Sequence, residues 1–537
     1  MRLHLLLLAI SLSCANMAAQ QSQYTISGTV INTTTGQPLD RADVSLLISG
    51  TEQGQTLAEA TTNADGHFAF THLAAAKYSL RAERQGYLAA AYDEHDGFST
   101  SIVTGEGLIS DGLIFRLAPY AVIGGTITDD SGDPVSHARV SLFRQDTRNG
   151  TDKIVRAGMA FTDDSGAYEF ARLEPGNYFL SVAATPWYAS PSHPHWDASD
   201  NVTPETTRSP LDVAYPITFY ADVTDENDAT PIPLKAGGHE RIDFTLHAVP
   251  AVHLSFKIPA APGQSSHAPQ IQHEVFGTTQ VDAATLYYGG DVVNNSMLIG
   301  VPELAPGHYK VILPNNYAAD VDASGDLDLD AAHMAPLSDV SGKIAMADST
   351  PLPGRMSVSL QAIDGDSPSD GRTDANGSFT IHEVSPGSYQ LSVSAEGKRL
   401  HVAQIMATGA TVDGHILKIG SQPVDLAATL VEGAATISGF AKQNGKPSSG
   451  VMLLLVPNHS KFNSDLFRRA QSNSDGSFEL RQVVPGSYTL VAIEDGWALD
   501  WARPEAITHY LSKGQAVIVS PGIRNLPLKD PLEIQPK

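Results

Sequence analysis

Two groups of aromatic side chains have the spacing expected of binding sites. The first lies in a long irregular stretch and consists of Trp187, Tyr188 and Trp196, with His193 and His195 close by. Exposed aromatic rings form flat apolar platforms, and such platforms suit the apolar faces of sugar rings. The group is therefore a candidate carbohydrate site. The alternative is that its rings cover a domain core or a domain junction.

The second aromatic group is Trp497 and Trp501, which are four residues apart near the C-terminus. This spacing places both indoles on one side of a short helix. We predict a second ligand-binding surface there. The alternative is a loop that packs over the end of a β-sandwich.

An acidic segment has the oxygen-ligand spacing of a calcium loop. Its candidate ligands occupy positions 1, 3, 5, 7 and 9 of that segment and are Asp320, Asp322, Ser324, Asp326 and Asp328. Position 12 is Ala331 where a bidentate Glu is expected, and no flanking helices are predicted. Calcium is thus an optional cofactor, and the alternative is a solvated acidic linker. No other cofactor is predicted.

The sequence lacks the motifs of zinc peptidases and of serine hydrolases. A zinc peptidase needs closely spaced His and Glu ligands with a distant His, and neither His-x-x-Glu nor His-Glu-x-x-His occurs. The Gly-x-Ser-x-Gly turn of serine hydrolases is also missing. These absences predict a protein that is not an enzyme, and they disfavour a protease.

The charge of the chain narrows its partners. The formal net charge is −25 over 537 residues, and an acidic surface repels phosphate backbones. Nucleic acid is therefore excluded as a partner. A polysaccharide or a protein of the cell envelope remains.

A motif that occurs four times predicts the strands and turns that must position these residues. Each copy has an Asp or Asn three residues before a Gly, then an aromatic residue two positions after it, and a tyrosine twelve positions after it. The copies are Asn63-Ala64-Asp65-Gly66-His67-Phe68, Asp163-Asp164-Ser165-Gly166-Ala167-Tyr168, Asp374-Ala375-Asn376-Gly377-Ser378-Phe379 and Asn473-Ser474-Asp475-Gly476-Ser477-Phe478. The tyrosines are Tyr78, Tyr178, Tyr389 and Tyr488.

The motif predicts a tight turn followed by an alternating, half-buried strand. In three copies a Pro-Gly pair precedes the tyrosine, and it predicts a second turn whose Gly takes the left-handed conformation, so that the two strands form a hairpin in one antiparallel sheet. Equivalent first strands precede the motifs, for example at 26–30 and 437–441. Repeats of this kind predict a string of similar β-sandwiches.

This pattern resembles the carboxypeptidase regulatory-like domain family, whose members are transthyretin-like or Cna-B-like sandwiches with a carbohydrate-binding-like fold. The resemblance covers nearly all of the chain after its first residues. The whole chain is similar to multi-copy secreted proteins of Gram-negative bacteria. It implies no peptidase activity. The fold class implied is all-β, a tandem array of about five Ig-like or transthyretin-like β-sandwich domains.

The Cna-B-like resemblance also implies a covalent possibility that we weighed and disfavoured. Some such domains cross-link a Lys of the first strand to an Asn of the last strand, with an acidic residue between them. Lys442, Glu479 and Asn525 have the required types and order. In simple alternation, however, Lys442 shares a face with Phe440 and not with the inward-facing Ile437.

The predicted domains are 20–118, 119–248, 249–332, 333–432 and 433–537. The third is a degenerate copy because Met297 stands where the turn Gly belongs, although Tyr309 is in place. Domain 2 carries the long aromatic loop, and domain 3 ends in the acidic linker.

The first residues, 1–19, have the features of a secretory signal peptide. A short basic start precedes an apolar run from Leu5 to Leu12, too short to cross a bilayer, and small residues follow as far as Ala19. The only cysteine, Cys14, fits a lipidation motif poorly because no branched apolar residue stands three positions before it. No later stretch is long enough to span a membrane.

Together these features predict a secreted, monomeric and elongated protein in the periplasm, on the cell surface or outside the cell. The leading hypothesis is a non-catalytic binding or scaffold protein with carbohydrate as its ligand, and it rests mainly on the family resemblance. The alternative is a structural spacer or protein-docking array without a small-molecule site.

Overall fold

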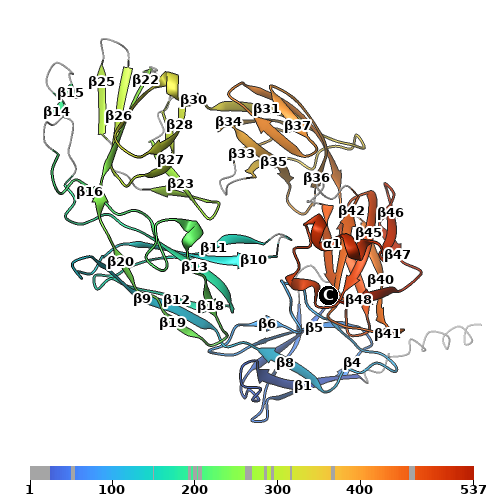
Figure 1. Ribbon diagram of the computed structural model, residues 1–537. Coiled ribbons are helices and arrows are strands. Elements are labelled where there is room, and N and C mark those ends of the chain that lie inside the picture. The colour runs from blue at the N-terminus through green and yellow to red at the C-terminus, as the bar shows by residue number, and fades with distance from the viewer. Residues whose placement is uncertain are drawn as a thin grey trace, which may run out of the picture.

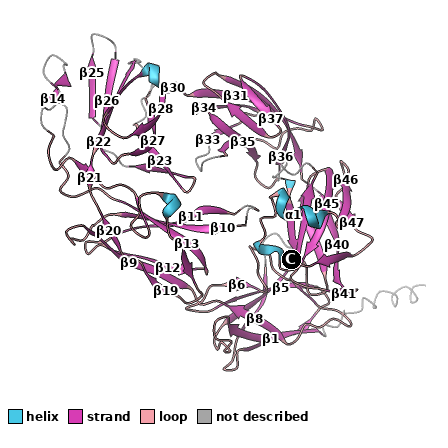
Figure 2. Cartoon of the chain, in the orientation of Figure 1, coloured by secondary structure: helices cyan, strands magenta, loops and turns pink. Residues whose placement is uncertain are grey.

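The structure of the chain is a computed structural model, which describes residues 24–49, 55–148, 150, 152–190, 195–196, 202–203, 208–259, 269–282, 287–291, 296–314, 317–363, 369–398, 400–433, 435–458 and 466–537. Strands dominate these residues, among which there is one α-helix, α1 (Pro504–Leu511). The strands form five successive β-sandwiches (Figures 1 and 2). Domains 1 to 4 each have two separate main sheets, whereas in domain 5 the strand β48 (Leu532–Gln535) pairs with both layers and joins them into one nine-stranded sheet. The predicted all-β tandem array is confirmed.

Domain 1 shows the plan that the other domains repeat. In its first sheet, β1 (Tyr24–Asn32) lies between the antiparallel β4 (His67–Leu73) and the parallel β8 (Leu113–Leu117). The second sheet contains β2 (Asp43–Ile48), β3 (Thr56–Thr61), β5 (Lys77–Glu83), β6 (Ala90–Ala91) and β7 (Ile102–Val103). Every second residue of the main strands points into the core between the sheets, as the alternation predicts.

Domains 2 and 3 follow the same plan. Domain 2 has one sheet of β9 (Ala121–Asp129), β12 (Ala167–Leu173), β19 (His239–Arg241) and β20 (Phe244–Leu246), and one of β10 (Arg139–Asp146), β11 (Lys153–Phe161), β13 (Gly176–Ala183), β17 (Thr218–Phe219) and β18 (Ile232–Leu234). Two small pairs add β14 (His195–Trp196) to β15 (Val202–Thr203), and β16 (Val213–Ala214) to β21 (Val249–Pro250). Domain 3 has β22 (Val252–Pro259), β25 (Tyr287–Asp291), β26 (Ser296–Leu304) and β29 (Leu327–Asp330) facing β23 (Gln270–Val275), β24 (Thr278–Asp282), β27 (Gly307–Leu313), β28 (Tyr317–Ala323) and β30 (Ala335–Pro336).

The last two domains complete the array. Domain 4 has β31 (Ser338–Met346), β34 (Ser378–Val384), β36 (Leu400–Thr408) and β39 (Val424–Glu432) facing β32 (Ser357–Ala362), β33 (Ser369–Arg372), β35 (Gly387–Ser394), β37 (Ala410–Asp413) and β38 (Ile416–Ile419). Domain 5 has β40 (Ala435–Gln443), β41 (Lys446–Pro447), β44 (Ser477–Val483), β47 (Asn525–Pro527) and β48 (Leu532–Gln535) facing β42 (Met452–Pro457), β43 (Arg468–Gln471), β45 (Gly486–Ile493) and β46 (Gln515–Val519).

The Asx-Gly turn forms as predicted. In domain 1 the Asn63 side chain accepts hydrogen bonds from the backbone N–H of Asp65 and of His67, and Gly66 has a φ of +70°. Asp163 and Asp374 accept the equivalent pairs of bonds in domains 2 and 4. The repeated motif is therefore a turn signal, with its glycine at a conformation that side chains disfavour.

The prediction that the motif strand and the tyrosine strand form a hairpin in one sheet is wrong. In domain 1, β4 pairs with β1 in the first sheet, whereas β5 pairs with β2 in the second. The same separation holds in all five domains. The connection is a corner at which the chain crosses from one sheet to the other.

The tyrosine holds this corner. In every domain its hydroxyl donates to the carbonyl oxygen four residues earlier, over 2.7–3.1 Å, in the pairs Tyr78–Ala74, Tyr178–Glu174, Tyr309–Ala305, Tyr389–Ser385 and Tyr488–Val484. The glycine two residues before the tyrosine leaves room for the ring, since a Cβ at Gly387 would lie 3.3 Å from Tyr389. That glycine does not take the predicted left-handed conformation. A non-glycine residue six positions before the tyrosine does, such as Glu383 with a φ of 60°.

Domain 3 is a complete two-sheet sandwich with its own core. It lacks the turn glycine, yet it keeps the left-handed residue, Glu303 with a φ of 64°, and the Tyr309 corner bond. The corner is thus a more constant mark of this fold than the Asx-Gly turn.

In domain 5 the strand β42 is buried on both faces. One face lines the sandwich core, and the other packs under Trp497, Trp501 and helix α1 in a second apolar cluster. That cluster also includes Phe98 of domain 1. The path of the five domains therefore turns back on itself, so that the last domain contacts the first (Figure 1), which the prediction of an elongated array did not anticipate.

Candidate functional site

The most elaborate side-chain assembly lies where domains 1, 2 and 5 meet, and Arg469 is at its centre. Arg469 is on the edge strand β43 of domain 5, and its side chain is only 8% exposed. The guanidinium carbon lies 5.1 Å from the ring centroid of Phe98, 5.8 Å from that of Trp497 and 4.8 Å from that of Trp501. A guanidinium within about 6 Å of an aromatic face is attracted by the ring quadrupole, and most strongly when water is excluded.

The same guanidinium carries two polar contacts, one to each neighbouring domain. It donates to a carboxylate oxygen of Asp96 in domain 1 at 2.8 Å, and to the backbone carbonyl of Arg148 in domain 2, also at 2.8 Å. A buried cation is stable only when it is paired and hydrogen-bonded. Arg469 satisfies that requirement with groups from two other domains, so closing the junction is what stabilises it in this position.

The aromatic rings around Arg469 are fixed by their own neighbours. Trp497 stands on the short 3-10 helix η5 (Gly496–Ala498) and donates from its indole nitrogen to the carbonyl of Gly450 at 3.2 Å. The His95 ring of domain 1 stacks on Trp497 at 5.3 Å, with the two planes 8° apart. Trp501 precedes helix α1 and packs against Phe467 at 5.3 Å.

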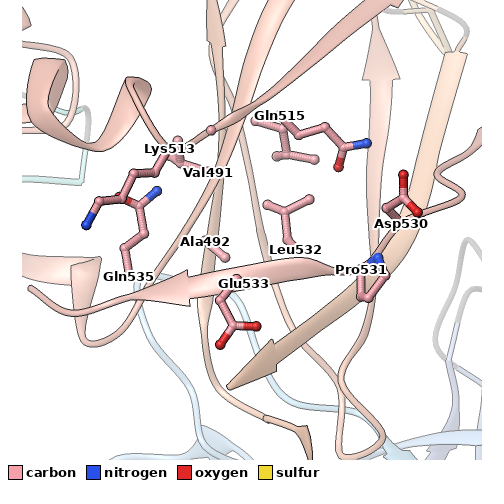
Figure 3. Close-up of a pocket in the computed structure, with 11 residues that line it drawn as sticks. Val491, Ala492, Lys513, Gln515, Asp530, Pro531, Leu532, Glu533 and Gln535 are labelled. Atoms are coloured by element: carbon pink, nitrogen blue, oxygen red, sulfur yellow. The ribbon is translucent and has the colours of Figure 1, made fainter. Parts of the chain in front are cut away.

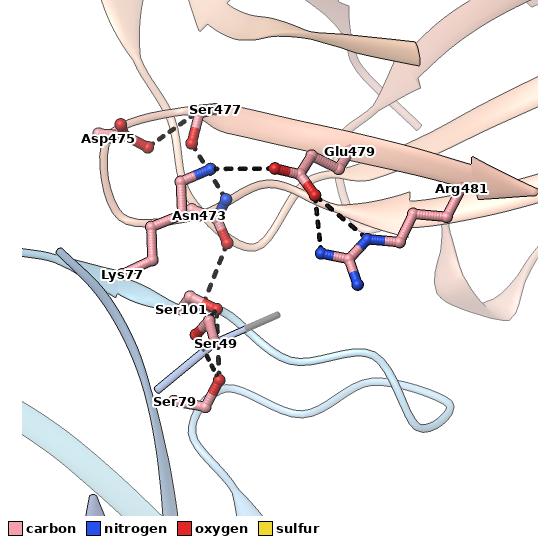
Figure 4. Close-up of polar contacts among 9 residues, drawn as sticks. All are labelled: Ser49, Lys77, Ser79, Ser101, Asn473, Asp475, Ser477, Glu479 and Arg481. Atoms are coloured by element: carbon pink, nitrogen blue, oxygen red, sulfur yellow. Dashed lines mark hydrogen bonds and ion pairs between the residues drawn. The ribbon is translucent and has the colours of Figure 1, made fainter. Parts of the chain in front are cut away.

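The Asx-Gly turn of domain 5 docks on domain 1 (Figure 4). The Ser474 N–H donates to the carbonyl of Ser101, and the Ser101 N–H donates to the Asn473 side chain. The Val103 N–H donates to the Ser474 hydroxyl at 2.8 Å. These bonds satisfy backbone groups along β7, a strand whose pairing within domain 1 is with β5 alone.

Further polar contacts extend this surface. Gln471 donates to the backbone carbonyl of Asp93 and to the hydroxyl of Thr100 at 2.8 Å. At the rim, the Lys77 ammonium of domain 1 lies 3.8 Å from a carboxylate oxygen of Glu479 (Figure 4). The hydrogen bond from Arg481, followed by the nearby Lys77 charge, holds the pKa of Glu479 below its ordinary value.

Domain 2 closes the junction through the tip of its β10–β11 connection. The Ala502 N–H donates to the carbonyl of Gly150 at 2.7 Å. A Cβ at Gly150 would lie 2.6 Å from the Ala502 side chain and 2.7 Å from the Trp501 ring. Only a residue without a side chain allows this approach.

A second junction joins domains 2 and 3. The two-residue turn of the β23–β24 hairpin inserts Phe276 between Phe143, Phe179 and Phe219 of domain 2, with ring centroids 5.1, 5.2 and 5.4 Å away. The Phe276 N–H also donates to Glu226 of domain 2 at 2.6 Å. Phe276 has a φ of 51°, a conformation that is rare for a bulky residue and that this packing stabilises.

The structure places the predicted aromatic groups differently. Trp497 and Trp501 are each 8% exposed and are packed in the three-domain junction, so the prediction that they form a ligand-binding surface is replaced by the alternative of a packed loop. Trp187 is 79% exposed, with the half-buried Tyr188 edge-on to it at 5.7 Å. Trp196 lies in the β14–β15 pair, whereas His193 is outside the described residues. Among the described residues, Trp187 and Tyr188 are not part of the cluster that contains Trp497 and Trp501.

The acidic segment does not fold as a calcium loop. Asp320 and Asp322 lie on β28 and both bond the His308 ring, at 2.8 and 2.7 Å. The later carboxylates have other partners: Asp326 bonds Arg208 of domain 2, and Asp328 on β29 bonds Ser255 of the neighbouring strand β22. Ser324 is exposed between them. Within the described parts of the chain, no group of three potential ligands is placed to hold a metal ion.

Contact with the Asp322 carboxylate raises the pKa of His308 above its ordinary value. The segment thus spans two strands, with Asp320 and Asp322 sharing His308 and the later carboxylates bonded elsewhere.

The residues considered for a covalent cross-link are also apart. Asn525 pairs with Thr436 at the start of β40, whereas Lys442 lies six residues along the strand and pairs with Pro447 and Glu533. Since a strand rises about 3.3 Å per residue, some 20 Å separate the two positions. The disfavoured cross-link is not formed.

One pocket of about 260 Å³ lies in domain 5, where β45 changes partners. The strand pairs with β46 as far as Leu490 and with β48 from Ala492 onward. Figure 3 shows Lys513 and Gln535 on one side of Leu532, and Asp530 on the other. The pocket is open and carries both signs of charge, and it contains none of the predicted site residues.

Sequence reasoning missed Arg469, Asp96 and Phe98. Asp96 and Arg469 are 373 residues apart, and neither lies in the repeated motif. No pattern within one repeat signals a contact between the first and the fifth.

Two family models match parts of the chain. The carboxypeptidase regulatory-like domain model matches residues 25–102, 122–204 and 339–416. The model described as BOS complex subunit NOMO1-like, second beta sandwich domain, matches residues 431–517. These are β-sandwich and regulatory-like families, and no catalytic family is indicated. No curated protein matches the chain.

Solved structures are similar only at a distance. The Bacillus anthracis TIE protein is 10% identical, with 76% of this chain and 74% of that chain covered and a TM-score of 0.18. A streptococcal ancillary pilin is 10% identical, with 57% and 99% covered and a TM-score of 0.19. GBS52, a minor pilin of Streptococcus agalactiae, is 15% identical, with 44% and 100% covered and a TM-score of 0.19. At these TM-scores the likenesses carry no argument about fold or function.

Proposed function

We propose that this protein is a non-catalytic scaffold whose five sandwiches are held in a closed arrangement by the Arg469 junction. The chain carries three carboxypeptidase regulatory-like domains and a NOMO-like β-sandwich domain. The observation that carries this proposal is the buried Arg469 guanidinium, which is surrounded by three rings and bonded to two other domains. A spacer with freely moving domains has no use for such a contact between its ends.

The junction has the properties of a specific interface. At its centre are buried aromatic rings and one arginine, residue types that dominate interface energetics. Around them lie directional hydrogen bonds from the Ser474 turn to backbone groups of domain 1. Because each of these bonds requires one orientation, the interface fixes the relative placement of the domains as well as holding them together.

The junction offers no catalytic chemistry. Its ionisable groups are paired with each other, as Arg469 with Asp96 and Lys77 with Glu479. The Thr100 hydroxyl donates to the Asp93 carboxylate at 2.9 Å, but Thr100 is 1% exposed and also accepts from Gln471, so this pair is enclosed in the interface rather than open to a substrate. We therefore assign the buried polar groups of this region to domain placement.

We place this scaffold in the cell envelope or outside the cell, reached through the signal peptide predicted at 1–19, which lies outside the described residues. No helix in the described ranges is long and apolar enough to cross a membrane. The Gram-negative source and the processing of Cys14 stay predictions.

Small-angle scattering of the mature chain from Gln20 tests the closed arrangement. We expect the wild type to be compact and Arg469→Ala to gain roughly 30 Å in maximum dimension, about one domain diameter, because domain 5 leaves domain 1. Arg524→Ala removes an exposed arginine of the same domain and serves as the matched control. A wild type as extended as Arg469→Ala contradicts the proposal.

Carbohydrate binding at Trp187 is a second candidate, favoured by the 79% exposure of that indole. A glycan screen tests it, with saturable binding expected for the wild type and lost in Trp187→Ala. Ile109, which is also 79% exposed, gives the control Ile109→Ala. Absence of binding, or equal loss in the control, rules the site out.

A further inference from the structure

We propose that the surface between domains 1 and 5 also joins copies of this chain when closure within one chain is prevented, with domain 5 of one copy bound to domain 1 of another. This inference rests on the proposed scaffold function, because it uses the same junction. It adds a partner, which is a second copy, and a geometry, which is head to tail.

The two halves of the interface belong to the two ends of the described chain. The domain 1 half comes from residues 77–103, and the domain 5 half from residues 450–502. Three whole domains connect them, so the contact is not imposed by a short linker. The same atoms can therefore meet within one chain or between two, and the choice depends on the path of the intervening domains.

Opening the junction leaves both halves with unsatisfied groups. Domain 1 loses the partners of the Ser101 and Val103 backbone N–H groups, which turns β7 into a bare strand edge. Domain 5 loses the carboxylate that pairs with Arg469 and one ring of its cage, Phe98. A bare strand edge and a partly stripped aromatic cluster are both surfaces that recruit a partner.

The two halves are different surfaces that complement each other. Domain 1 contributes the anion Asp96 and the cation Lys77, and domain 5 contributes the opposite charges Arg469 and Glu479. Each copy therefore presents one half from domain 1 and the other half from domain 5. The interface is therefore heterologous, and between copies it produces closed rings or open head-to-tail chains.

Closure within one chain normally wins. Tethering gives domain 5 an effective concentration near domain 1 on the order of millimolar, far above that of free protein in dilute solution. The wild type is thus expected to be a closed monomer. Exchange between copies is expected when neither chain can close on itself, provided that one chain has an intact domain 1 half and the other has an intact domain 5 half.

Charge reversal separates these conditions. In Arg469→Asp the domain 5 half is damaged and the domain 1 half is intact, and in Asp96→Arg the reverse holds. Each variant alone is expected to be an open monomer, because like charges face each other within the chain. In an equimolar mixture, the intact Arg469 of one variant meets the intact Asp96 of the other.

The experiment is light-scattering chromatography of the mature chain from Gln20. We expect each variant alone, and the wild type, to have the monomer mass, and the mixture to contain a species of twice that mass. The pair Arg469→Ala and Phe98→Ala repeats the test with smaller changes. Melting curves of all four variants serve as the control for folding. A mixture that stays monomeric, while scattering shows each variant open, overturns exchange but leaves the scaffold function standing. Variants that stay compact on their own overturn both.

Discussion

The junction between domains 2 and 3 is apolar at its centre, whereas the junction of domains 1, 2 and 5 is built around a cation. In the first, Phe276 fills a space between three phenylalanine rings of the preceding domain. In the second, Arg469 lies among three rings and also bonds Asp96 and the carbonyl of Arg148. The two junctions thus differ in what fills their centre, an aromatic plug in one and a cation in the other, although an ion pair such as Arg208–Asp326 also links domains 2 and 3.

The cost of bringing the domains together explains this difference. Domains 2 and 3 are joined by a short connection around 246–252, so little chain entropy is lost when they dock. The apolar Phe276 plug therefore fills the centre of their junction, and the Arg208–Asp326 and Asp212–His253 pairs add to it. Domains 1 and 5 are separated by more than 300 residues and must also choose the correct partner among five similar sandwiches. Oriented bonds and opposite charges supply that choice.

Removal of the central cation is expected to have the largest effect. Arg469→Ala leaves Asp96 without its partner and should weaken closure by about 3–5 kcal/mol, the cost of breaking a buried pair from one side. Arg469→Lys keeps the charge but loses the planar group that bonds two partners, and it should recover only part of the closure. Scattering at increasing urea measures this order, and full recovery by lysine would show that charge alone holds the junction.

Removal of the apolar plug is expected to come next. Phe276→Ala should lower the stability of the domain 2–3 unit by about 2–4 kcal/mol, somewhat below a fully buried phenylalanine, and should leave the contact of domain 5 with domain 1 unchanged. Differential scanning calorimetry measures the loss. Phe440→Ala removes a half-exposed ring of domain 5 as a control, and an equal loss in both would contradict the plug.

A wedge at the three-domain junction should have a smaller effect. Gly150→Ala places a Cβ within 2.7 Å of Trp501, whereas Gly132→Ala, at the same φ of +84°, meets nothing within 4 Å. Both carry the backbone strain of about 1 kcal/mol that left-handed residues cost, so their difference isolates the clash. We expect scattering to show a looser junction only in Gly150→Ala; identical profiles would mean that domain 2 does not press on Trp501.

Acidification is expected to have the smallest effect. The pKa of Glu479 is held below its ordinary value, so its contribution is present above that ordinary value and is lost as the pH falls through the lowered pKa. Arg481 supplies most of the shift within domain 5, and only the share from Lys77 affects closure. The pair is partly exposed, so the change should stay below about 1 kcal/mol.

Scattering between pH 5 and pH 3 measures the acid effect. The loss of closure attributable to this pair should be absent in Glu479→Gln, which cannot titrate. An identical acid response in the variant would assign the effect to other carboxylates.

Local patterns in the sequence were sufficient for the repeat but not for the corner. The Asx-Gly turn depends on residues within four positions of one another, such as Asn63 and His67, and it was predicted correctly. The pairing of β4 and β5 with different sheets depends on contacts of each strand with β1 and β2, which the hairpin reading ignored. The tyrosine spacing was visible in the sequence, but its hydroxyl bond four residues back was not inferred.

The contact between domains 1, 2 and 5 could not be predicted from the sequence. The sequence does not reveal that Trp497 and Trp501 are buried, because the covering groups Phe98 and Arg469 come from other parts of the chain. Contacts between similar domains leave no periodic signal. They are decided by single residues at strand edges, where the repeats differ most.

The closed arrangement is tested most directly by a distance between the chain ends. The mature chain from Gln20 has no cysteine, so Arg41→Cys in domain 1 and Arg524→Cys in domain 5 accept spin labels without other changes. We predict one narrow distance distribution in the otherwise wild-type chain, and a longer, broad one when Arg469→Ala is added. A broad distribution that Arg469→Ala does not alter would contradict the closed scaffold.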